Sequence, residues 1–315
     1  MTDGLREEFG KVALLMGGWS AEREISLKSG AAVLAALQRL SVNVEAIDMD
    51  IDIVQVLREG HYDRVFNIVH GRGGEDGNLQ ALLEFLHLPY TGTGVLGSAL
   101  AMDKMRCKAL WAGMRLPTPE ALMIRSERDC AAVLNSLPLP LAVKPVLEGS
   151  SVGISKVKQA EELADAWRAA AQYGEVMAER WIEGSEYTVS ILNNEALPVI
   201  RLQPAREFYD FTAKYADNSG TEYHCPSGLD KSLESSVRQL GLQAFEAIGG
   251  SSWGRVDLML DADNNPWLIE VNTVPGMTDH SLVPMAAKTA GIDFDELVLR
   301  ILRGTLSQRS ESHAR

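Results

Sequence analysis

Acidic side chains recur in two apolar segments of the sequence that are joined by a turn. The segments cover residues 253–260 and 267–272, and the polar run between them, 261–266, is typical of a hairpin turn. A loop of two or four residues centred there would place Asp257 directly opposite Glu270 on neighbouring strands. The same register predicts a buried apolar ladder on the other face, with Trp253, Met259 and Trp267 also in the core: Val256–Val271, Leu258–Ile269 and Leu260–Trp267.

Two carboxylates that face each other across a sheet repel unless a cation compensates their charge. Carboxylate and amide oxygens are hard ligands that suit Mg²⁺, which also binds substrate phosphate. The sequence therefore predicts a magnesium site formed by Asp257, Glu270 and Asn272. The alternative is a solvated polar face on which Arg255 bridges the two acids.

A second segment has residues that could hold phosphate. Lys144 ends an apolar segment, and the Gly/Ser-rich run 148–153 that follows supplies flexible backbone N–H donors. A single lysine at a strand end is more often an ordinary surface residue, so the inference depends on the neighbouring loop. The Gly-x-x-x-x-Gly-Lys-Ser/Thr sequence is absent, which excludes a standard P-loop.

The run from Gly92 to Gly97 matches the dinucleotide-binding pattern G-x-G-x-x-G by letter. That pattern should follow a long apolar strand at the start of a βαβ unit, and only residues 88–91 precede it. A turn that leads into the helix carrying Lys104 is the better interpretation.

The first hundred residues alternate short apolar runs with helical patterns, which predicts a parallel sheet covered by helices. The expected strands are 12–16, 44–48 and 65–70, and the expected helices are 23–40, 53–58 and 79–87. Ligands bind at the carboxyl ends of such strands, where the sequence has two glycine-rich loops, 17–22 and 70–77.

Pro117 and Pro119 follow a helix predicted from 102 to 112 and indicate a domain boundary. The remaining predicted elements are strands 141–145, 176–181, 187–192 and 197–202, and helices 160–172 and 231–248, before the hairpin and two closing helices. The polar and aromatic segment 203–227 is longer than most loops, which suggests a functional role. The polar end, 307–315, is expected to be a flexible tail.

Composition excludes several classes of protein. The 315 residues are 46% hydrophobic and 23% charged, as in ordinary globular proteins. The net charge of −13 has the wrong sign for binding nucleic acid or an anionic membrane surface. Three cysteines, Cys107, Cys130 and Cys225, indicate reduced thiols in a cytoplasmic protein, and no apolar run is long enough to span a membrane.

Taken together, the motifs resemble the D-alanine–D-alanine ligase family of the ATP-grasp superfamily, over the chain to about residue 302. The segments that carry the resemblance are 17–24, 70–77, 102–104, 143–145, 148–153, 208–215, 254–257, 268–272, 275–278 and 280–284. The resemblance implies an α/β protein of three domains: an N-terminal parallel-sheet domain (1–103), and a central domain (104–186) and a C-terminal domain (187–306) that are both α+β and clasp ATP. It also implies that 203–227 forms a mobile lid, and that two D-alanines are joined through an acyl phosphate.

The resemblance also assigns roles to residues. Glu22, linked to Ser150 and Tyr215, would anchor the ammonium group of the first D-alanine, although Glu22 alone could be an acid favoured by a helix dipole. Arg255 and the backbone N–H of Gly276 would form an oxyanion hole. Ser281 and Lys214 would bind the carboxylate of the second substrate beside His70, which could otherwise be an ordinary buried histidine. The expected ATP contacts are Lys104, Lys144, Ser151, Glu179, Trp181, Ile182 and Glu186, and the expected metal ligands are Asp257, Glu270 and Asn272.

Family members usually bind two Mg²⁺ ions, which Mn²⁺ can replace, and the resemblance further implies a cytoplasmic homodimer. Two positions depart from the family pattern: Trp19 replaces a common small polar residue and Val274 replaces a frequent serine. The alternatives are a D-alanine–D-lactate ligase, disfavoured by Tyr215, and a non-catalytic nucleotide-binding regulator, disfavoured because the acids and Arg255 are present.

Overall fold

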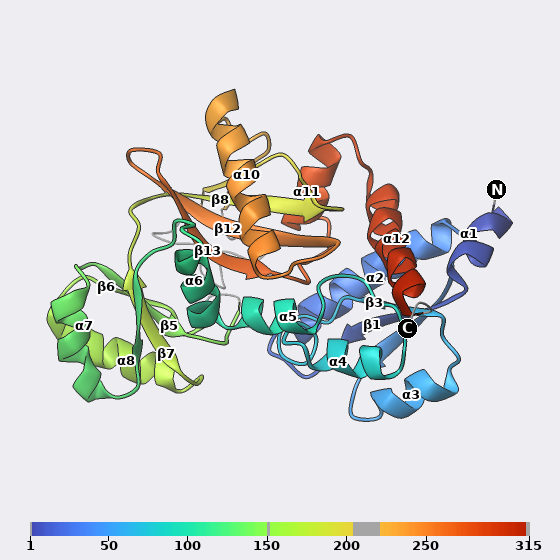
Figure 1. Ribbon diagram of the computed structural model, residues 1–315, viewed down its shortest axis with the longest axis horizontal. Helices are drawn as coiled ribbons and strands as arrows, with labels where there is room; N and C mark the ends of the chain where they lie inside the picture. Colours follow the sequence, from blue (N-terminus) through green and yellow to red (C-terminus); the bar gives the residue numbers. More distant parts are fainter. Residues whose placement is uncertain (1, 150–151, 204–220, 313–315) are drawn as a thin grey trace.

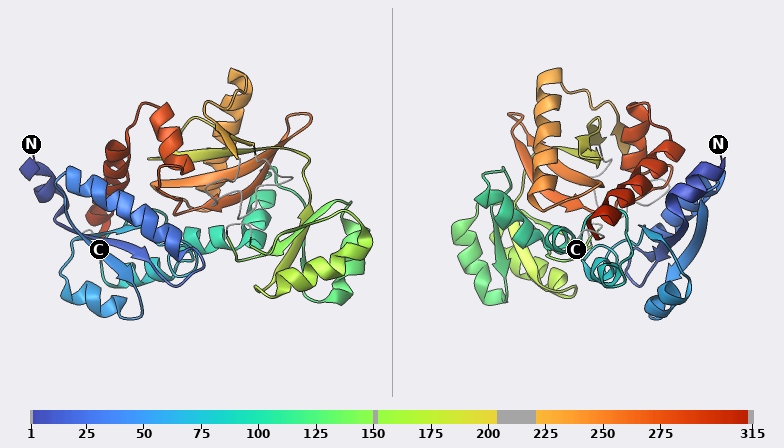
Figure 2. Two further views of the ribbon diagram at one scale, coloured as in Figure 1. Left: turned by 180° about the vertical axis from the view of Figure 1, so that it is seen from behind. Right: turned by 45° about the vertical axis from the view of Figure 1, so that its right-hand side comes forward.

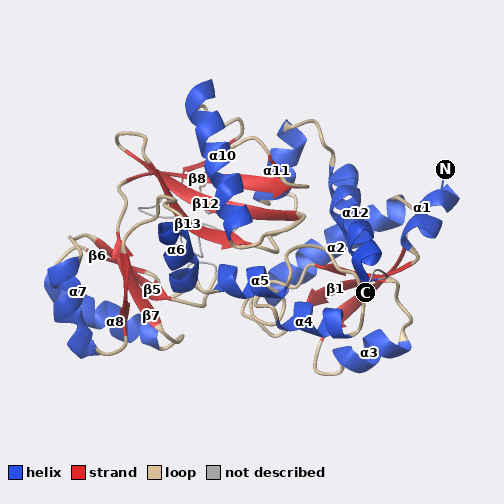
Figure 3. Cartoon of the chain, viewed as in Figure 1, coloured by secondary structure: helices blue, strands red, loops and turns tan. Residues whose placement is uncertain are grey.

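The computed structural model describes residues 2–149, 152–203 and 221–312, and the strands in these ranges form three sheets. Figure 1 shows the first sheet at one end of the molecule, the central sheet at the other, and the largest sheet above and between them. Most helices pack on the outer faces of the sheets, whereas α5 (Val95–Met102) and α6 (Lys104–Gly113) lie between the sheets (Figure 3). In the described ranges, no helix combines the length and apolar character that crossing a bilayer requires.

The first sheet is parallel, as the alternating pattern predicts. Its order is β2-β1-β3, with β1 at Lys11–Gly17, β2 at Asn43–Met49 and β3 at Arg64–Asn67. The helices are α1 (Thr2–Phe9), α2 (Arg23–Arg39), α3 (Ile53–Glu59), α4 (Asn78–Phe85) and α5 (Val95–Met102). Strand β3 ends three residues before the predicted end at His70. The Asn67 side chain accepts a hydrogen bond from Val69 N at 3.0 Å and donates to Gly74 O at 2.9 Å, which turns the backbone out of the sheet.

The central sheet has four antiparallel strands in the order β4-β7-β5-β6. They are β4 (Ala121–Ile124), β5 (Leu141–Pro145), β6 (Ser155–Val157) and β7 (Val176–Arg180), with helices α6 (Lys104–Gly113), α7 (Cys130–Ser136) and α8 (Leu163–Ala171). Short 3₁₀ turns at Glu127–Asp129 and Ala160–Glu162 precede α7 and α8. The sequence predicted β5 and β7, whereas β4 and β6, with four and three residues, are too short for a recognisable alternation.

The third sheet has the order β11-β10-β8-β12-β13, with β9 paired to β8. Its strands are β8 (Gly184–Leu192), β9 (Glu195–Ala196), β10 (Ile200–Gln203), β11 (Glu222–His224), β12 (Trp253–Asp261) and β13 (Pro266–Asn272). Strand β11 falls inside the segment that the sequence predicted as one long loop. Helices α10 (Lys231–Ala247), α11 (Leu282–Thr289) and α12 (Phe294–Ser312) complete the fold.

Helix α12 extends six residues into the segment predicted to be a flexible tail. Residues 307–312 contain neither glycine nor proline, so nothing in the sequence stops the helix from continuing beyond its packed part.

The β12–β13 hairpin confirms only half of the predicted register. Asp257 lies opposite Glu270 and Val256 opposite Val271, as expected. Between Asp257 and Leu258 the register shifts, so Leu258 pairs with Leu268 and the predicted Leu258–Ile269 and Leu260–Trp267 pairs are wrong. The cause is a β-bulge that places Ile269 outside the pairing; hydrophobic alternation alone does not reveal such an insertion.

One apolar core joins the first sheet to the third sheet and the C-terminal helices. It contains Leu14 and Phe66 from the first sheet, Val33 from α2, and Leu297 and Ile301 from α12. Figure 2 shows the last helix lying against the N-terminal part of the molecule.

Polar contacts join the two ends of the chain at the same place. The buried Arg64 donates through Nη1 to Thr305 Oγ1 at 2.8 Å and through Nε to Phe9 O at 2.6 Å. Arg303 in α12 contacts Glu8 in α1 at 3.4 Å. The first and last helices are therefore neighbours.

Candidate active site

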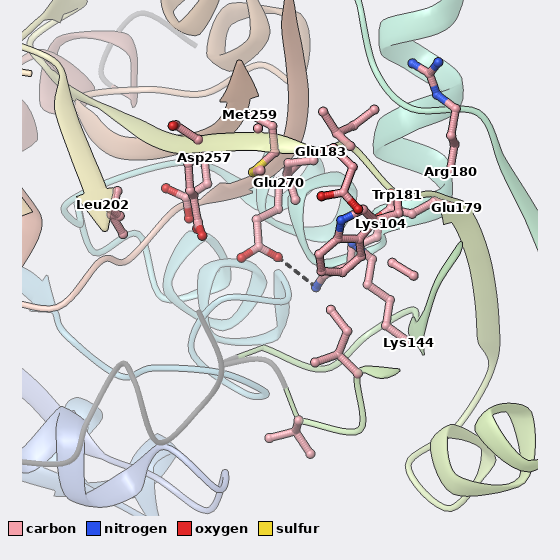
Figure 4. A pocket seen from close by; sticks show the side chains of 18 of the residues that line it. Lys104, Lys144, Glu179, Arg180, Trp181, Glu183, Leu202, Asp257, Met259 and Glu270 are labelled. Carbon is pink, nitrogen blue, oxygen red and sulfur yellow. Dashed lines mark ion pairs between the residues drawn. The ribbon is translucent and has the colours of Figure 1, made fainter. Parts of the chain in front are cut away.

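A cavity of about 360 Å³ lies between the central and third sheets. Figure 4 shows side chains from both sheets and from α6 pointing into it. Eight of the residues predicted to bind nucleotide or metal line this cavity: Lys104, Lys144, Glu179, Trp181, Ile182, Glu186, Asp257 and Glu270. The structure thus brings together residues from sequence positions 104 to 270 that the sequence had assigned to one site.

The linker from β7 to β8 forms one wall of the cavity. Trp181 N donates to Pro140 O at 3.0 Å, which holds the linker against the end of the central sheet. The Lys156 ammonium lies 4.4 Å from the centre of the Trp181 ring and 2.9 Å from Glu183 Oε1. These contacts fix the linker where a planar base could pack between the two sheets.

Two residues line the cavity although the sequence predicted otherwise: one was expected in the core, and the other in the apolar ladder of the hairpin. Met259 is on the same face of β12 as Asp257, and Ile269 is the residue displaced by the bulge. Trp253 is buried as predicted. Trp267 is only partly buried and lies under the Arg180 guanidinium, 4.2 Å from its ring centre. The alternation of the strand places Met259 on the polar face with Asp257, so the core position predicted from its hydrophobic side chain is wrong.

The two facing acids of the hairpin are each held by a cation. Arg255 donates to Asp257 through Nε at 2.8 Å and through Nη2 at 2.7 Å. Thr188 Oγ1 donates to the same carboxylate at 2.6 Å. Glu270 Oε2 lies 3.3 Å from Lys104 Nζ, the ion pair drawn in Figure 4. Asp257 and Glu270 are therefore oriented side by side at the cavity.

Asn272 is placed differently from the two acids. It pairs with Arg255, two positions along the hairpin from the Asp257–Glu270 pair, and its Oδ1 accepts a hydrogen bond from Val274 N at 3.2 Å. It does not line the cavity.

Lys104 and Lys144 both line the cavity, and Lys104 N donates to Val146 O, two residues after Lys144, at 3.3 Å. Lys104 begins α6, and its Nζ donates to Glu148 O at 2.8 Å. Lys144 in β5 pairs with Glu179 in β7, and Lys108 Nζ reaches the same carboxylate at 2.7 Å. Burial opposes ionisation of Glu179, yet Lys108 and Lys144 keep the pKa of its carboxyl below the usual value. Burial also lowers the pKa of the Lys108 ammonium, an effect that Glu179 opposes.

A second group of predicted residues lies at the carboxyl end of the first sheet. His70 Nδ1 is 2.7 Å from Val274 O, and its Nε2 is 3.2 Å from Ser29 Oγ. Ser29 Oγ also accepts from Met277 N at 3.1 Å. A Cβ atom added at Gly276 would lie 2.9 Å from Ser281 Oγ. Ser29, which the sequence interpretation did not single out, thus links His70 to the backbone at residues 276–277, beside which Ser281 lies.

Glu22 connects this group to the Gly/Ser loop. A Cβ atom added at Gly149 would lie 3.3 Å from Glu22 Oε2, and one added at Gly71 would lie 2.9 Å from the same atom. Close to this point, Arg72 forms an ion pair with Glu148 at 3.3 Å. The Glu148–Gly149 backbone therefore lies between the cavity and the second group.

Glu75 is a site residue that sequence interpretation missed. Its Oε1 lies 3.8 Å from His70 Nδ1, and its side chain is 14% exposed. Burial raises the pKa of the Glu75 carboxyl, and the negative charge of Glu22 raises it further. The only signal in the sequence was its place in the loop 70–77, where an acid after glycines looks like a solvent-exposed residue.

Four predicted site residues lie outside the described residues. They are Ser150 and Ser151 in the Gly/Ser loop, and Lys214 and Tyr215 in the segment expected to be a lid. Most of that segment, 204–220, is also outside the described ranges.

Comparisons with known proteins agree with this geometry. The family described as D-ala D-ala ligase C-terminus matches residues 110–303, and the one described as D-ala D-ala ligase N-terminus matches residues 53–93. A D-alanine–D-alanine ligase from Methylococcus capsulatus is 57% identical over 94% of this chain and 96% of its own length. One from Pseudomonas fluorescens is 52% identical over 98% and 95%.

Solved structures give the same result. The D-alanine–D-alanine ligase from Bacillus anthracis in complex with ATP superposes with a TM-score of 0.84 at 30% identity, covering 96% of this chain and 99% of that one. The VanG D-Ala:D-Ser ligase from Enterococcus faecalis superposes with a TM-score of 0.82 at 27% identity, covering 94% and 99%. The chain has the predicted fold and belongs to the D-alanine–D-alanine ligase family.

Proposed function

We propose that the protein joins two D-alanine molecules to D-alanyl-D-alanine, a precursor of peptidoglycan, and converts ATP to ADP and phosphate. The observation that carries this proposal is the arrangement of one continuous site. Two lysines and two acids face a cavity of nucleotide size, and the loop at Glu148 leads from that cavity to Glu22 and His70. The family relationship supplies the identity of the substrates.

The chemistry needs an activated acyl group, because a carboxylate is a poor acyl donor. In the proposed reaction, a carboxylate oxygen of the first D-alanine takes the γ-phosphoryl group of ATP and ADP leaves. The amine of the second D-alanine then attacks the carbonyl carbon and loses a proton to solvent, and phosphate leaves with the C–O electron pair. Both steps depend on positioning and on charge stabilisation rather than on a covalent enzyme intermediate.

The residues divide this work by position. Lys104 and Lys144 would contact phosphates, the 181–182 backbone would hold the adenine, and Glu186 would contact the ribose. Glu22 would bind the first ammonium group, and His70 and Ser281 would lie near the second substrate. Arg255 is held by two hydrogen bonds to Asp257. It is therefore preorganised to stabilise negative charge on the tetrahedral carbon's oxygen, together with Gly276 N–H.

The charge of the cavity supports the metal proposal. Its lining contains four Lys or Arg residues against six Asp or Glu residues, so an ATP polyanion would be repelled unless cations bind with it. The described residues contain no cluster of three His, Cys, Asp or Glu that could hold a metal by protein ligands alone. That fits Mg²⁺, which commonly binds through one or two carboxylates and completes its coordination with phosphate and water.

We therefore propose that Asp257 and Glu270 bind Mg²⁺, with Asn272 as a third ligand if its side chain leaves Val274 N. When bound, Mg²⁺ would neutralise phosphate charge during phosphoryl transfer. Two ions, replaceable by Mn²⁺, are the proposed stoichiometry. We also propose a cytoplasmic homodimer; light scattering on the purified protein tests the oligomeric state.

Phosphate release tests the activity. With ATP and Mg²⁺, D-alanine should stimulate release and L-alanine should not. D-Lactate added to D-alanine should yield little mixed product, because the proposed product is a dipeptide. Phosphate release that is absent or independent of D-alanine would contradict the proposal, and a mixed ester as main product would favour a D-alanine–D-lactate ligase.

Asp257→Asn tests the metal site. The substitution removes a ligand charge, so the Mg²⁺ concentration for half-maximal phosphate release should rise by at least about tenfold. Replacing residues that only hydrogen-bond to metal ligands already lowers metal affinity by about this factor. Asp261→Asn is the matched control, because Asp261 ends the same strand and bonds to Trp267 Nε1 outside the cavity. An equal Mg²⁺ requirement in both variants would remove Asp257 from the metal site.

A further inference from the structure

Lys108 is a fully buried cation directly behind the wall of the nucleotide cavity. It is 3% exposed and does not line the cavity itself. Its Nζ forms an ion pair with Glu179 Oε2 at 2.7 Å and donates hydrogen bonds to Thr118 Oγ1 at 2.8 Å and Leu268 O at 3.5 Å. Because Thr118 Oγ1 itself donates to Leu268 O at 2.8 Å, it must accept from Lys108. One carboxylate and two neutral oxygen atoms therefore surround the buried ammonium group.

These contacts join three parts of the fold that enclose the cavity. Lys108 belongs to α6, Glu179 to β7 of the central sheet, and Leu268 to β13 of the third sheet. Lys108 therefore fixes the distance between the two sheets at the level of Lys144.

The charges of this cluster have a consequence for Lys144. Glu179 is 4% exposed and lies between Lys108 and Lys144, which is 6% exposed and faces the cavity. If Lys144 and Glu179 formed an isolated pair, their charges would cancel and the pair would attract phosphate weakly. With Lys108 also bound to the carboxylate, two ammonium groups share one negative charge. The cluster then keeps one net positive charge beside a cavity whose lining is rich in acids.

We propose that Lys108 is a positioning residue for nucleotide binding: by sharing Glu179, it leaves the positive charge of Lys144 available to the phosphates of ATP. This inference rests on the proposed function. It goes beyond that function because it assigns a role in ATP affinity to a residue that does not touch the ligand.

Calorimetric titration of the full-length protein with ATP and Mg²⁺ tests the inference. Lys108→Met should raise the Kd for ATP by about 10- to 100-fold, the range expected when one charge is lost at an effective dielectric constant of about 20. Lys108→Gln keeps a donor for Thr118 without the charge and should show the same loss. If Lys108→Met fails to fold, the Gln variant supplies the measurement.

The double variant Lys108→Met with Glu179→Gln separates charge from structure. It restores one net positive charge on Lys144, so ATP affinity should recover by at least about fivefold relative to Lys108→Met alone, a gain corresponding to roughly 1 kcal/mol. Thr118→Val is the matched control: it removes a hydrogen bond at the same junction without changing charge. It should lower the melting temperature and leave the Kd within about twofold.

Each outcome has a distinct meaning. Unchanged ATP affinity in Lys108→Met and Lys108→Gln would overturn the inference, as would equal weakening in Thr118→Val or a double variant that recovers nothing. Loss of D-alanine-dependent phosphate release in the unmodified protein would instead contradict the proposed function. Because the titration measures ATP binding alone, the test of Lys108 does not depend on whether the protein catalyses the proposed reaction.

Discussion

At the scale of single residues, the site depends on ionisable groups that are removed from water. Asp257, Glu179 and Glu270 each have a cation within ion-pair distance, which offsets the cost of their burial. Glu75 differs, because the ionisable groups that act on it are His70 and the acid Glu22. Because burial raises the pKa of Glu75, we expect its ionisation to lower the stability of the fold near neutral pH.

Glu75→Gln tests that cost. Burial raises the pKa of Glu75 in the folded state, so above the usual pKa of about 4.3 the unfolded chain ionises first and the fold loses stability. The variant cannot ionise. Its free energy of unfolding should match the unmodified protein near pH 4 and exceed it at pH 7. Urea denaturation at both pH values gives the comparison, and an advantage of the same size at both would contradict the role of ionisation.

At the scale of elements, close packing of helices on the third sheet holds the site strands in place. Helix α10 packs on β8 at Gly241, where an added Cβ atom would lie 2.8 Å from Val189 Cβ. Strand β8 carries Glu186 and Thr188 on its opposite face, towards the cavity and Asp257. The glycine thus permits a helix-to-sheet approach on which the site strand depends.

Gly241→Ala should lower the free energy of unfolding by about 1–3 kcal/mol, the usual cost of overpacking a core. Gly113→Ala is the matched control, because Gly113 is also helical and has no atom within 4 Å of an added Cβ. There the higher helix propensity of alanine should raise stability by up to about 1 kcal/mol. Chemical denaturation of both variants provides the test, and equal effects would show that packing at Gly241 is not tight.

Long periodic elements and charged motifs could be predicted from the sequence, and local irregularities could not. Helix α10 and strand β5 agree with the predictions within one residue, because their patterns extend over the whole element. The bulge at Ile269 and the three-residue strand β11 depend on individual hydrogen bonds that no pattern encodes. Lys108 looked like any helical lysine, since its importance arises from partners on two sheets.

At the scale of the whole molecule, the proposed N-terminal and C-terminal domains are not independent. One apolar core combines residues of β1 and α2 with residues of α11 and α12. The central sheet differs, because its buried cluster contains only residues between Ile124 and Ala178. The three proposed domains should therefore differ in their ability to fold alone.

Fragments 1–103 and 118–183 test this difference. The first fragment would lose the part of its core contributed by residues 192–302, so we expect no cooperative thermal transition by circular dichroism. The second keeps its complete apolar cluster and should show a cooperative, although low, transition. A sharp transition in fragment 1–103 would show that its own helices are sufficient to cover the sheet.

The contact between the first and last helices has a consequence for chain connectivity. Because Glu8 and Arg303 are neighbours and Arg64 bonds to Thr305, a peptide linker that leaves α12 soon after Thr305 and enters α1 just before Glu8 could connect the last helix to the first. New termini could then be opened in the connection between α6 and β4, ahead of Pro117 and Thr118, which hold this connection to β13. Such a circular permutant would keep every described strand while moving the ends of the polypeptide next to the nucleotide-binding half of the enzyme.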